Sequence, residues 1–205
     1  RREVRLRVGT RFELGMSWLL PAVMALEKAR PNWQIDLYCG ASADILERLN
    51  GGQLDAIVTS SPIAAATHVA QVLHPESYEL VASRRLAARV PVKEIADCKA
   101  HTLLDLDEGL PLARYLTSAA PGIEFAGVRF CGSTGIVFAR VRAGDGVAVL
   151  PSYMVERELK ERRLLRLLPK VALFSDSFRL ISRKGASASE PLAVLAEYLR
   201  GRKLR

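Results

Sequence analysis

The stretch VRFCGSTGIVFARVRAGDGVAVLP, residues 128–151, decides the fold of this chain. It predicts a strand that ends near Phe130, a turn with Ser133 at the N-cap, and a helix to about Arg142. A Gly-Asp-Gly turn then leads to a second buried strand, residues 147–150, which stops at a proline. Two strands separated by a helix form a βαβ unit. The N-terminus of such a helix lies at the carboxyl edge of a parallel sheet, where its positive dipole end favours an anion.

Three further strands are predicted in the first third of the chain, at residues 4–9, 33–40 and 54–59. Each ends in a polar turn, and the residues of these turns are Thr10, Arg11, Ser42, Thr59 and Ser60. Ligands of open α/β sheets bind outside the carboxyl ends of the strands. We therefore expect these turns to face the turn formed by Ser133, Thr134 and Gly135 across a ligand-binding cleft.

Each of these side chains also has an ordinary structural interpretation. Thr10, Ser42 and Ser133 suit the N-caps of helices, which stabilise a helix by about 1 kcal/mol. Arg11 suits a solvated surface position, although a guanidinium there can also receive a carboxylate. The convergence of the hydroxyl groups supports a ligand site, whereas no single hydroxyl does.

The chain order of the elements predicts an α/β protein with two lobes. A helix over residues 18–29 carries a broad apolar stripe that suits a core and also a partner. We expect residues 1–81 and 183–205 to form the first lobe and residues 82–182 to form the second. The short crossings near residues 81–83 and 181–183 would then act as the hinge.

The net charge of +8 comes from the two ends of the chain. Residues 1–11 carry five arginines and one glutamate, and residues 200–205 carry four basic residues and no acidic one. The remaining 188 residues therefore have balanced charge. Without a basic face or a recognition motif, we do not expect this chain itself to bind nucleic acid.

Several other classes of function have no support in the sequence. No nucleophile elbow, Walker A loop, dinucleotide fingerprint or paired-carboxylate pattern is found, so we expect neither enzyme activity nor a cofactor. The three cysteines and three histidines lack metal-type spacing. No apolar run approaches the ~18 residues that span a membrane, and no signal peptide opens the chain. These features predict a cytoplasmic protein with reduced thiols.

Taken together, several segments resemble the effector-binding domain of LysR-type transcriptional regulators over essentially the whole chain. The segments are LRVG (6–9), LLP (19–21), RP (30–31), IDLYCG (35–40), LNGGQLDAIV (49–58) and VRAGDGVAVLP (141–151). Their order and spacing are more specific than any one of them. Two features depart from the family: a stretch that is often His-Pro-Leu-Ala reads Arg-Arg-Leu-Ala at residues 84–87, and the segment between the lobes is short and alanine-rich.

The resemblance implies a type 2 periplasmic-binding-protein fold, with two Rossmann-like lobes, two crossover strands and a ligand cleft between the lobes. It implies that the turn at Ser133 faces a small effector, which we expect to be anionic. It also implies a dimer or tetramer in which the first-lobe helix of one chain packs against the second lobe of another. The family reads DNA through an N-terminal winged helix-turn-helix, which we expect to be absent from this chain.

Two alternatives remain at this level. A transport-type solute-binding protein shares the fold, although the odd cysteine count and the family segments favour a regulator. The other is an effector-free dimerisation module. A hydrophobic cleft without a free polar centre would support this alternative.

Overall fold

The chain folds into two compact α/β units in the computed structural model, which describes residues 3–61, 63 and 66–204. Unit 1 consists of Arg1–Pro75 and Asp176–Arg205, and unit 2 consists of Glu76–Ser175. Both boundaries fall earlier than the sequence led us to expect. The reason is that the strand after the first boundary pairs within unit 2, and the strand after the second boundary pairs within unit 1.

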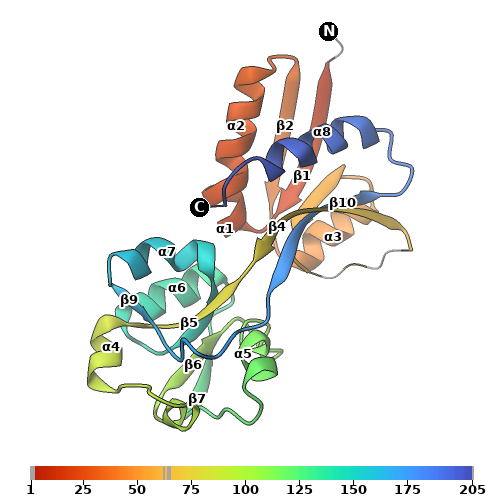
Figure 1. Ribbon diagram of the computed structural model, residues 1–205. Coiled ribbons are helices and arrows are strands. Elements are labelled where there is room, and N and C mark those ends of the chain that lie inside the picture. The colour runs from red at the N-terminus through yellow and green to blue at the C-terminus, as the bar shows by residue number, and fades with distance from the viewer. Residues whose placement is uncertain (1–2, 62, 64–65, 205) are drawn as a thin grey trace. The chain divides into compact units, whose positions relative to one another are not determined.

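Unit 1 alternates strands and helices through most of its length (Figure 1). Its elements are β1 (Val4–Thr10), α1 (Phe12–Leu14), the π-helix η1 (Gly15–Leu19), α2 (Leu20–Ala29), β2 (Trp33–Cys39), α3 (Ser42–Asn50), β3 (Ala56–Thr59), β4 (His68–Glu76), β10 (Asp176–Arg183) and α8 (Ser189–Arg200).

The sheet of unit 1 has the strand order β2-β1-β3-β10-β4. Strand β1 is parallel to β2, with Val4 opposite Trp33, and parallel to β3, with Val8 opposite Ala56. Strand β10 is antiparallel to β3. The three parallel strands therefore end at the same edge of the sheet, as the sequence predicted.

Helices cover both faces of this sheet. Gly9 faces α3, because a Cβ there would meet Leu54, Ile57 and Ile45 at 2.5–3.5 Å. The next residue, Thr10, points to the other face, as strand alternation requires. There a Cβ on Gly15 would come within 2.7 Å of the Cys39 sulfur, so only glycine lets η1 approach the strand ends this closely.

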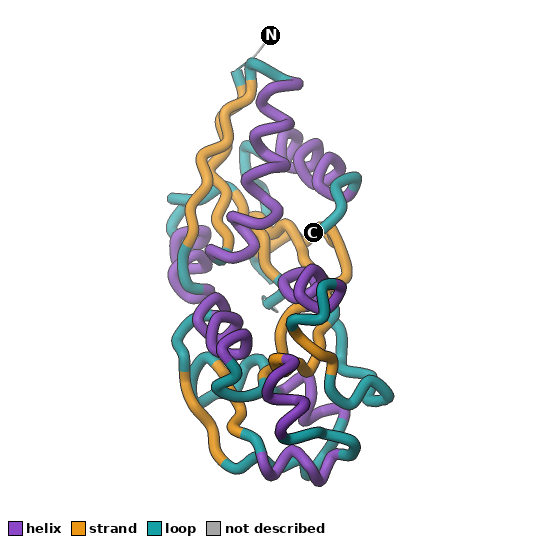
Figure 2. The backbone as a smooth tube through the Cα atoms, turned by 90° about the vertical axis from the view of Figure 1, so that its left-hand side faces the viewer, coloured by secondary structure: helices purple, strands orange, loops and turns teal. Residues whose placement is uncertain are grey.

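Helices α2 and α8 lie beside each other in unit 1, as Figures 1 and 2 show. The Trp18 indole N–H donates to the Arg202 carbonyl at 3.4 Å, and the Trp18 ring packs edge-on against His74.

The helix predicted for residues 18–29 is longer than expected. It begins at Phe12 and has a π-helical segment in its first half. Of its apolar stripe, Leu19, Val23 and Leu26 are buried.

Unit 2 contains the remaining elements. They are β5 (Tyr78–Ser83), α4 (Arg84–Arg89), the 3₁₀ helix η2 (Ile95–Ala100), β6 (Thr102–Asp105), α5 (Arg114–Ala119), β7 (Gly127–Phe130), α6 (Thr134–Ala143), β8 (Ala148–Pro151), α7 (Ser152–Lys160) and β9 (Leu164–Arg166).

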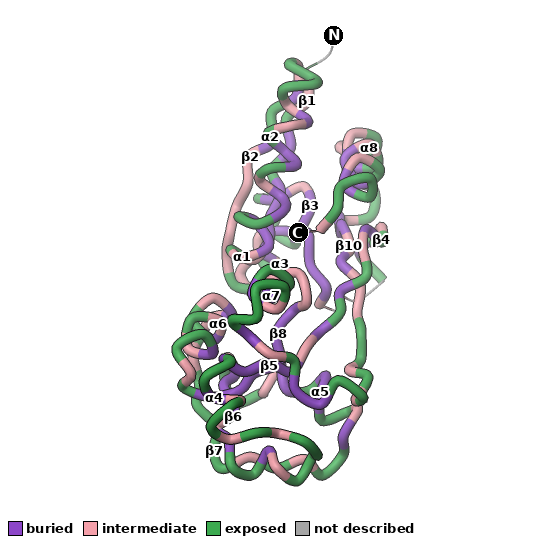
Figure 3. Tube along the Cα trace, turned by 60° about the vertical axis from the view of Figure 1, so that its left-hand side comes forward, coloured by how far each residue is buried: buried purple, intermediate pink, exposed green. Residues whose placement is uncertain are grey.

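The predicted βαβ unit is present as β7-α6-β8, but its two strands are not neighbours. Strand β6 pairs in parallel with β7, and a parallel bridge joins Leu103 of β6 to Val147 just before β8. Strand β8 then pairs antiparallel with β5, which pairs antiparallel with β9. Strands β5 and β8 are almost fully buried, whereas every residue of β7 is exposed (Figure 3).

Within the described residues, no helix combines the length and the apolar character needed to cross a membrane.

Candidate functional site

Two of the predicted hydroxyl groups are buried at the carboxyl edge of the unit 1 sheet. Thr10 ends β1, and its hydroxyl donates to the Val58 carbonyl at 3.0 Å. Thr59 ends β3, and its hydroxyl accepts the Ser61 backbone N–H at 3.0 Å. Because these bonds tie neighbouring strand ends and the following turn together, both hydroxyl groups shape the edge where a ligand is expected.

Ser42 does not cap its helix, contrary to the sequence-based prediction. It is the exposed first residue of α3, and Ala41 takes the N-cap position without a side-chain hydrogen bond. Asp44 provides the polar group at this helix start. It accepts from the Tyr38 hydroxyl at 2.7 Å and from Arg48 at 2.9 Å, and the Tyr38 bond in particular holds the pKa of the Asp44 carboxyl below its usual value.

Arg11 lies directly after β1, in an extended conformation before α1, and its side chain is half-buried. Ser60 lies directly after β3 and is 5% exposed. Both residues therefore follow strands at the predicted edge of unit 1.

A second cation at this edge was not found from the sequence. Arg179 lies on β10 opposite Thr59, and its guanidinium donates to the carbonyls of Ser177 at 3.0 Å and Ser60 at 3.5 Å. It also pairs with Asp176 at 3.2 Å. The sequence showed only that a strand returned here, and the antiparallel register that sets Arg179 beside Thr59 carries no local signal.

In unit 2, the turn before α6 has the predicted cap. The Ser133 hydroxyl accepts the Ile136 backbone N–H at 3.3 Å, and Gly132 has a φ of +75°, which favours glycine. Thr134 is buried and Gly135 is half-buried. Helix α6 is 10 residues long, so its N-terminus offers a positive dipole end to an anion.

A buried carboxylate at the end of β6 was also missed. Asp105 is 0% exposed and accepts backbone N–H groups from Leu106, Leu112 and Ala113 at 2.7–3.2 Å. Burial raises the pKa of this carboxyl above its usual value, while the three hydrogen bonds act in the opposite direction. Asp105 therefore fixes the segment that leads into α5.

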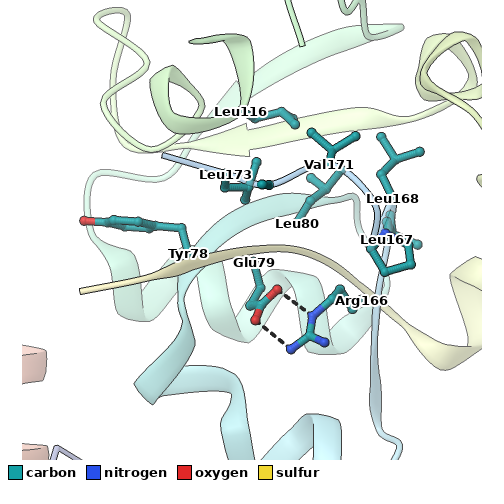
Figure 4. Close-up of a pocket in the computed structure, with 11 residues that line it drawn as sticks. Tyr78, Glu79, Leu80, Leu116, Arg166, Leu167, Leu168, Val171 and Leu173 are labelled. Carbon is teal, nitrogen blue, oxygen red and sulfur yellow. Dashed lines mark hydrogen bonds and ion pairs between the residues drawn. The ribbon is translucent and has the colours of Figure 1, made fainter. Parts of the chain in front are cut away.

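Unit 2 also contains a pocket of about 290 Å³ beneath the segment that follows β9 (Figure 4). Leu80, Leu116 and Val171 line its interior, and Glu79 and Arg166 face each other across its edge at 2.5 and 2.6 Å. The ion pair gives each of these two charged groups a partner at the edge of the pocket.

In the part of the chain that the structure describes, no group of three or more His, Cys, Asp or Glu residues is arranged to hold a metal ion. The three cysteines are free thiols, and burial raises the pKa of Cys98 to about 11.

The fold and the family segments agree with known proteins. The model of the LysR substrate-binding domain matches residues 1–203, and the chain belongs to this family. The family comprises effector-binding domains of transcriptional regulators and is not an enzyme family.

Two relatives from sequence comparison are regulators. The chain is 30% identical over 170 residues to the HTH-type transcriptional regulator AbaB of Streptomyces antibioticus, which covers 78% of this chain and 56% of that protein. It is 25% identical over 169 residues to the malonate utilization transcriptional regulator of Klebsiella pneumoniae, which covers 80% of this chain and 55% of that protein. The chain thus spans about half the length of these relatives.

Solved structures show the same fold. The regulatory domain of CrgA, a LysR-type regulator from Neisseria meningitidis, matches with a TM-score of 0.83 at 16% identity. The match covers 97% of this chain and 98% of the CrgA chain. The reduced form of the regulatory domain of OxyR2 from Vibrio vulnificus matches with a TM-score of 0.82 at 19% identity. The match covers 97% of this chain and 95% of the OxyR2 chain. These matches establish the two-lobed type 2 periplasmic-binding-protein-like fold.

Proposed function

We propose that this chain is the effector-sensing and oligomerisation domain of a bacterial LysR-type transcriptional regulator that acts in the cytoplasm. Family membership over residues 1–203 is the observation that carries the proposal. In this account the regulator contacts DNA through a separate winged helix-turn-helix, and the effector shifts the population of two arrangements of the units by its differential affinity for them.

The effector is a small anion in this proposal, and both units contribute to its site. Support comes from two separate places. In unit 1, Arg11 and Arg179 flank the strand ends that carry Thr10, Thr59 and Ser60. In unit 2, the Ser133-capped N-terminus of α6 provides the positive end of a helix dipole.

A thermal-unfolding screen tests this proposal. The chain is heated with carboxylates, amino acids, aromatic acids and sugar phosphates, and a ligand at 100 times its Kd is expected to add about 2.7 kcal/mol of stability. The Ser133→Ala variant should lose most of this ligand-induced shift.

Ser83→Ala is the matched control for the screen. Ser83 caps α4 in the same unit by accepting the Leu86 N–H at 3.2 Å. Ser83→Ala therefore removes a helix cap of the same kind as the one that Ser133→Ala removes. The control should keep the ligand-induced shift of a carboxylate effector. Equal loss in both variants, or a flat screen across the panel, would contradict effector sensing and favour a pure dimerisation module.

The oligomer is proposed from exposed apolar side chains on each unit. Phe12, Met16 and Met24 are 62%, 51% and 60% exposed and lie at spacings of four and eight on the α1-η1-α2 helix, hence on one side of it. In unit 2, Phe130 and Ile136 are about half exposed. A pairing of the two surfaces between copies would bury both.

Sedimentation of Met16→Glu tests this assembly. A buried carboxylate at such an interface should convert a dimer to a monomer. Glu47→Ala, an exposed change on the opposite-face helix α3, is the control and should leave the mass unchanged. A monomeric wild-type chain at high concentration would overturn the oligomer proposal and leave the fold untouched.

A further inference from the structure

Unit 2 carries a groove in which five of the eight lining residues are arginines. Its volume is about 590 Å³, and it lies where the start of α4 meets the ends of α6 and α7. The backbone N–H of Arg84 donates to the Arg163 carbonyl at 2.9 Å, which fixes α4 beside the end of α7. The lining residues are Ser83, Arg84, Arg85, Ala88, Arg142, Glu161, Arg162 and Arg163. Five arginines thus line the groove beside one lining carboxylate, Glu161, and a second carboxylate, Glu158, contacts two of them.

Three of the arginines are held by internal partners. Arg85 donates to the Ala143 carbonyl at the end of α6 at 2.7 Å. Arg163 binds the nearly buried carboxylate of Glu158 at 2.6 Å, and Arg142 approaches the same carboxylate at 3.5 Å. These contacts keep three guanidinium groups in place at the groove.

The other two arginines are not neutralised in this way. Within the described residues, neither Arg84 nor Arg162 has a carboxylate at ion-pair distance, and both side chains are exposed. Two guanidinium groups are therefore available to an anion beside three that are already positioned.

The backbone at Arg162 supports a role for its side chain. Helices α6 and α7 end in the same motif, in which one residue adopts a left-handed conformation and two N–H groups bond back into the last turn. That residue is Gly144 in α6, with φ +86°, and Arg162 in α7, with φ +55°. Glycine is the favoured residue there, so arginine disfavours the fold locally while it adds a cation to the groove.

We propose that this groove is a second ligand site, distinct from the Ser133 turn, and that it binds a small polyphosphate through its arginines. Guanidinium forks match phosphate oxygens bidentately. The volume lies in the range of small-molecule sites, about 300–1,000 Å³. No aromatic side chain lines the groove, so it offers no aromatic platform for a base. Recognition therefore rests on the di- or triphosphate group rather than on an attached organic group.

Calorimetric titration of the chain with inorganic triphosphate at low ionic strength tests the proposal. We expect binding that weakens on the order of tenfold in Arg84→Gln and in Arg162→Gly, because each removes a charge-assisted bond. Lys160→Gln is the matched control, since Lys160 lies on α7 and pairs with Glu156, neither of which lines the groove, and it should bind like the wild type. Ser133→Ala should also bind normally, which separates this site from the effector site.

Thermal unfolding of Arg162→Gly separates a lost site from a damaged fold. The variant should melt at or above the wild-type temperature while its triphosphate binding falls. Absence of triphosphate binding, or equal weakening in Lys160→Gln, would overturn the proposal. Displacement of triphosphate by duplex DNA of unrelated sequence, with the same dependence on Arg84, would overturn it in favour of a nucleic-acid contact.

Discussion

The two units are built from the same kinds of elements but differ in how completely their sheets are joined. In unit 1 the five strands form one hydrogen-bonded sheet, and the segments of β1 and β3 near the strand ends are buried. In unit 2 a three-stranded and a two-stranded ladder meet through a single bridge, and the edge strand β7 is exposed. The core of unit 1 should therefore be less tolerant of substitution than the β7 edge of unit 2.

The units also differ in the polar residues that end their parallel strands. In unit 1 the hydroxyl of Thr10 makes one hydrogen bond across the sheet. In unit 2 the carboxylate of Asp105 gathers three backbone N–H groups from the segment after β6. The carboxylate thus organises a whole connection, whereas the hydroxyl adjusts one strand end.

The largest difference is expected between Phe178→Ala and Val128→Ala. Phe178 is fully buried on β10 in unit 1, and its truncation should cost about 3–5 kcal/mol of unfolding free energy. Val128 is 44% exposed on β7, and its truncation should change stability by about 0.5 kcal/mol or less. Urea unfolding of both variants measures this. Similar losses would show that β7 is covered in solution, for example by a second copy.

Asp105→Ala and Thr10→Val compare the two strand ends. The first leaves three backbone N–H groups without their acceptor and should cost about 3 kcal/mol. The second removes a single hydroxyl with little change of shape and should cost about 1 kcal/mol. Thermal unfolding provides both values. The reverse order would mean that water replaces the carboxylate of Asp105 at no cost.

A smaller effect is expected from pH, through carboxylates of the two units. Arg163 holds the pKa of Glu158 below its usual value, so this group stabilises the fold above its unfolded pKa of about 4.3, and that stability is lost as pH falls through the lower folded pKa. Glu158→Gln should therefore be less stable than the wild type by about 1 kcal/mol at pH 7 and nearly equal to it near pH 3.

In unit 1 the carboxylate for the pH comparison with Glu158 is Asp44. Its pKa is also lowered, but its side chain is more exposed. Asp44→Asn should show a weaker pH dependence than Glu158→Gln, because solvent screens an exposed pair. Unfolding curves at several pH values measure both. A pH-independent deficit in Glu158→Gln would show that the substitution acts through packing.

The smallest effect compares the two helix ends within unit 2. Arg162→Gly relieves a left-handed residue and should stabilise the chain by about 1 kcal/mol, which corresponds to about 2–4 °C in Tm. Gly144→Ala places a residue with a Cβ in the same left-handed conformation and should lower the stability of the chain by a similar amount. Equal behaviour of the two variants would contradict the proposed strain at Arg162.

Much of the fold was predictable because it depends on local patterns. Apolar alternation and the glycine turns placed most strands within a few residues, and Ser133 caps α6 as its position before the helix indicates. The prediction that Ser42 caps α3 was wrong, because the helix begins one residue earlier than a Ser42 cap requires, with Ser42 as its first residue and Ala41 at the N-cap. The unit boundaries were also displaced, since long-range strand pairing decides them.

The candidate sites were less predictable because they depend on residues distant in sequence. Arg179 reaches the unit 1 edge only through the register of β10 with β3. The arginine groove escaped a charge count along the chain, because its five arginines come from three separate segments, residues 84–85, 142 and 162–163, that only the fold brings together.

The central claim is that one small anion is bound by residues of both units. Amide hydrogen exchange of the chain, with and without a ligand identified by thermal unfolding, tests it most directly. The account predicts slower exchange at residues 10–11 and 59–61 of unit 1 together with residues 133–136 of unit 2. Protection confined to one unit, or to the arginine groove alone, would contradict it.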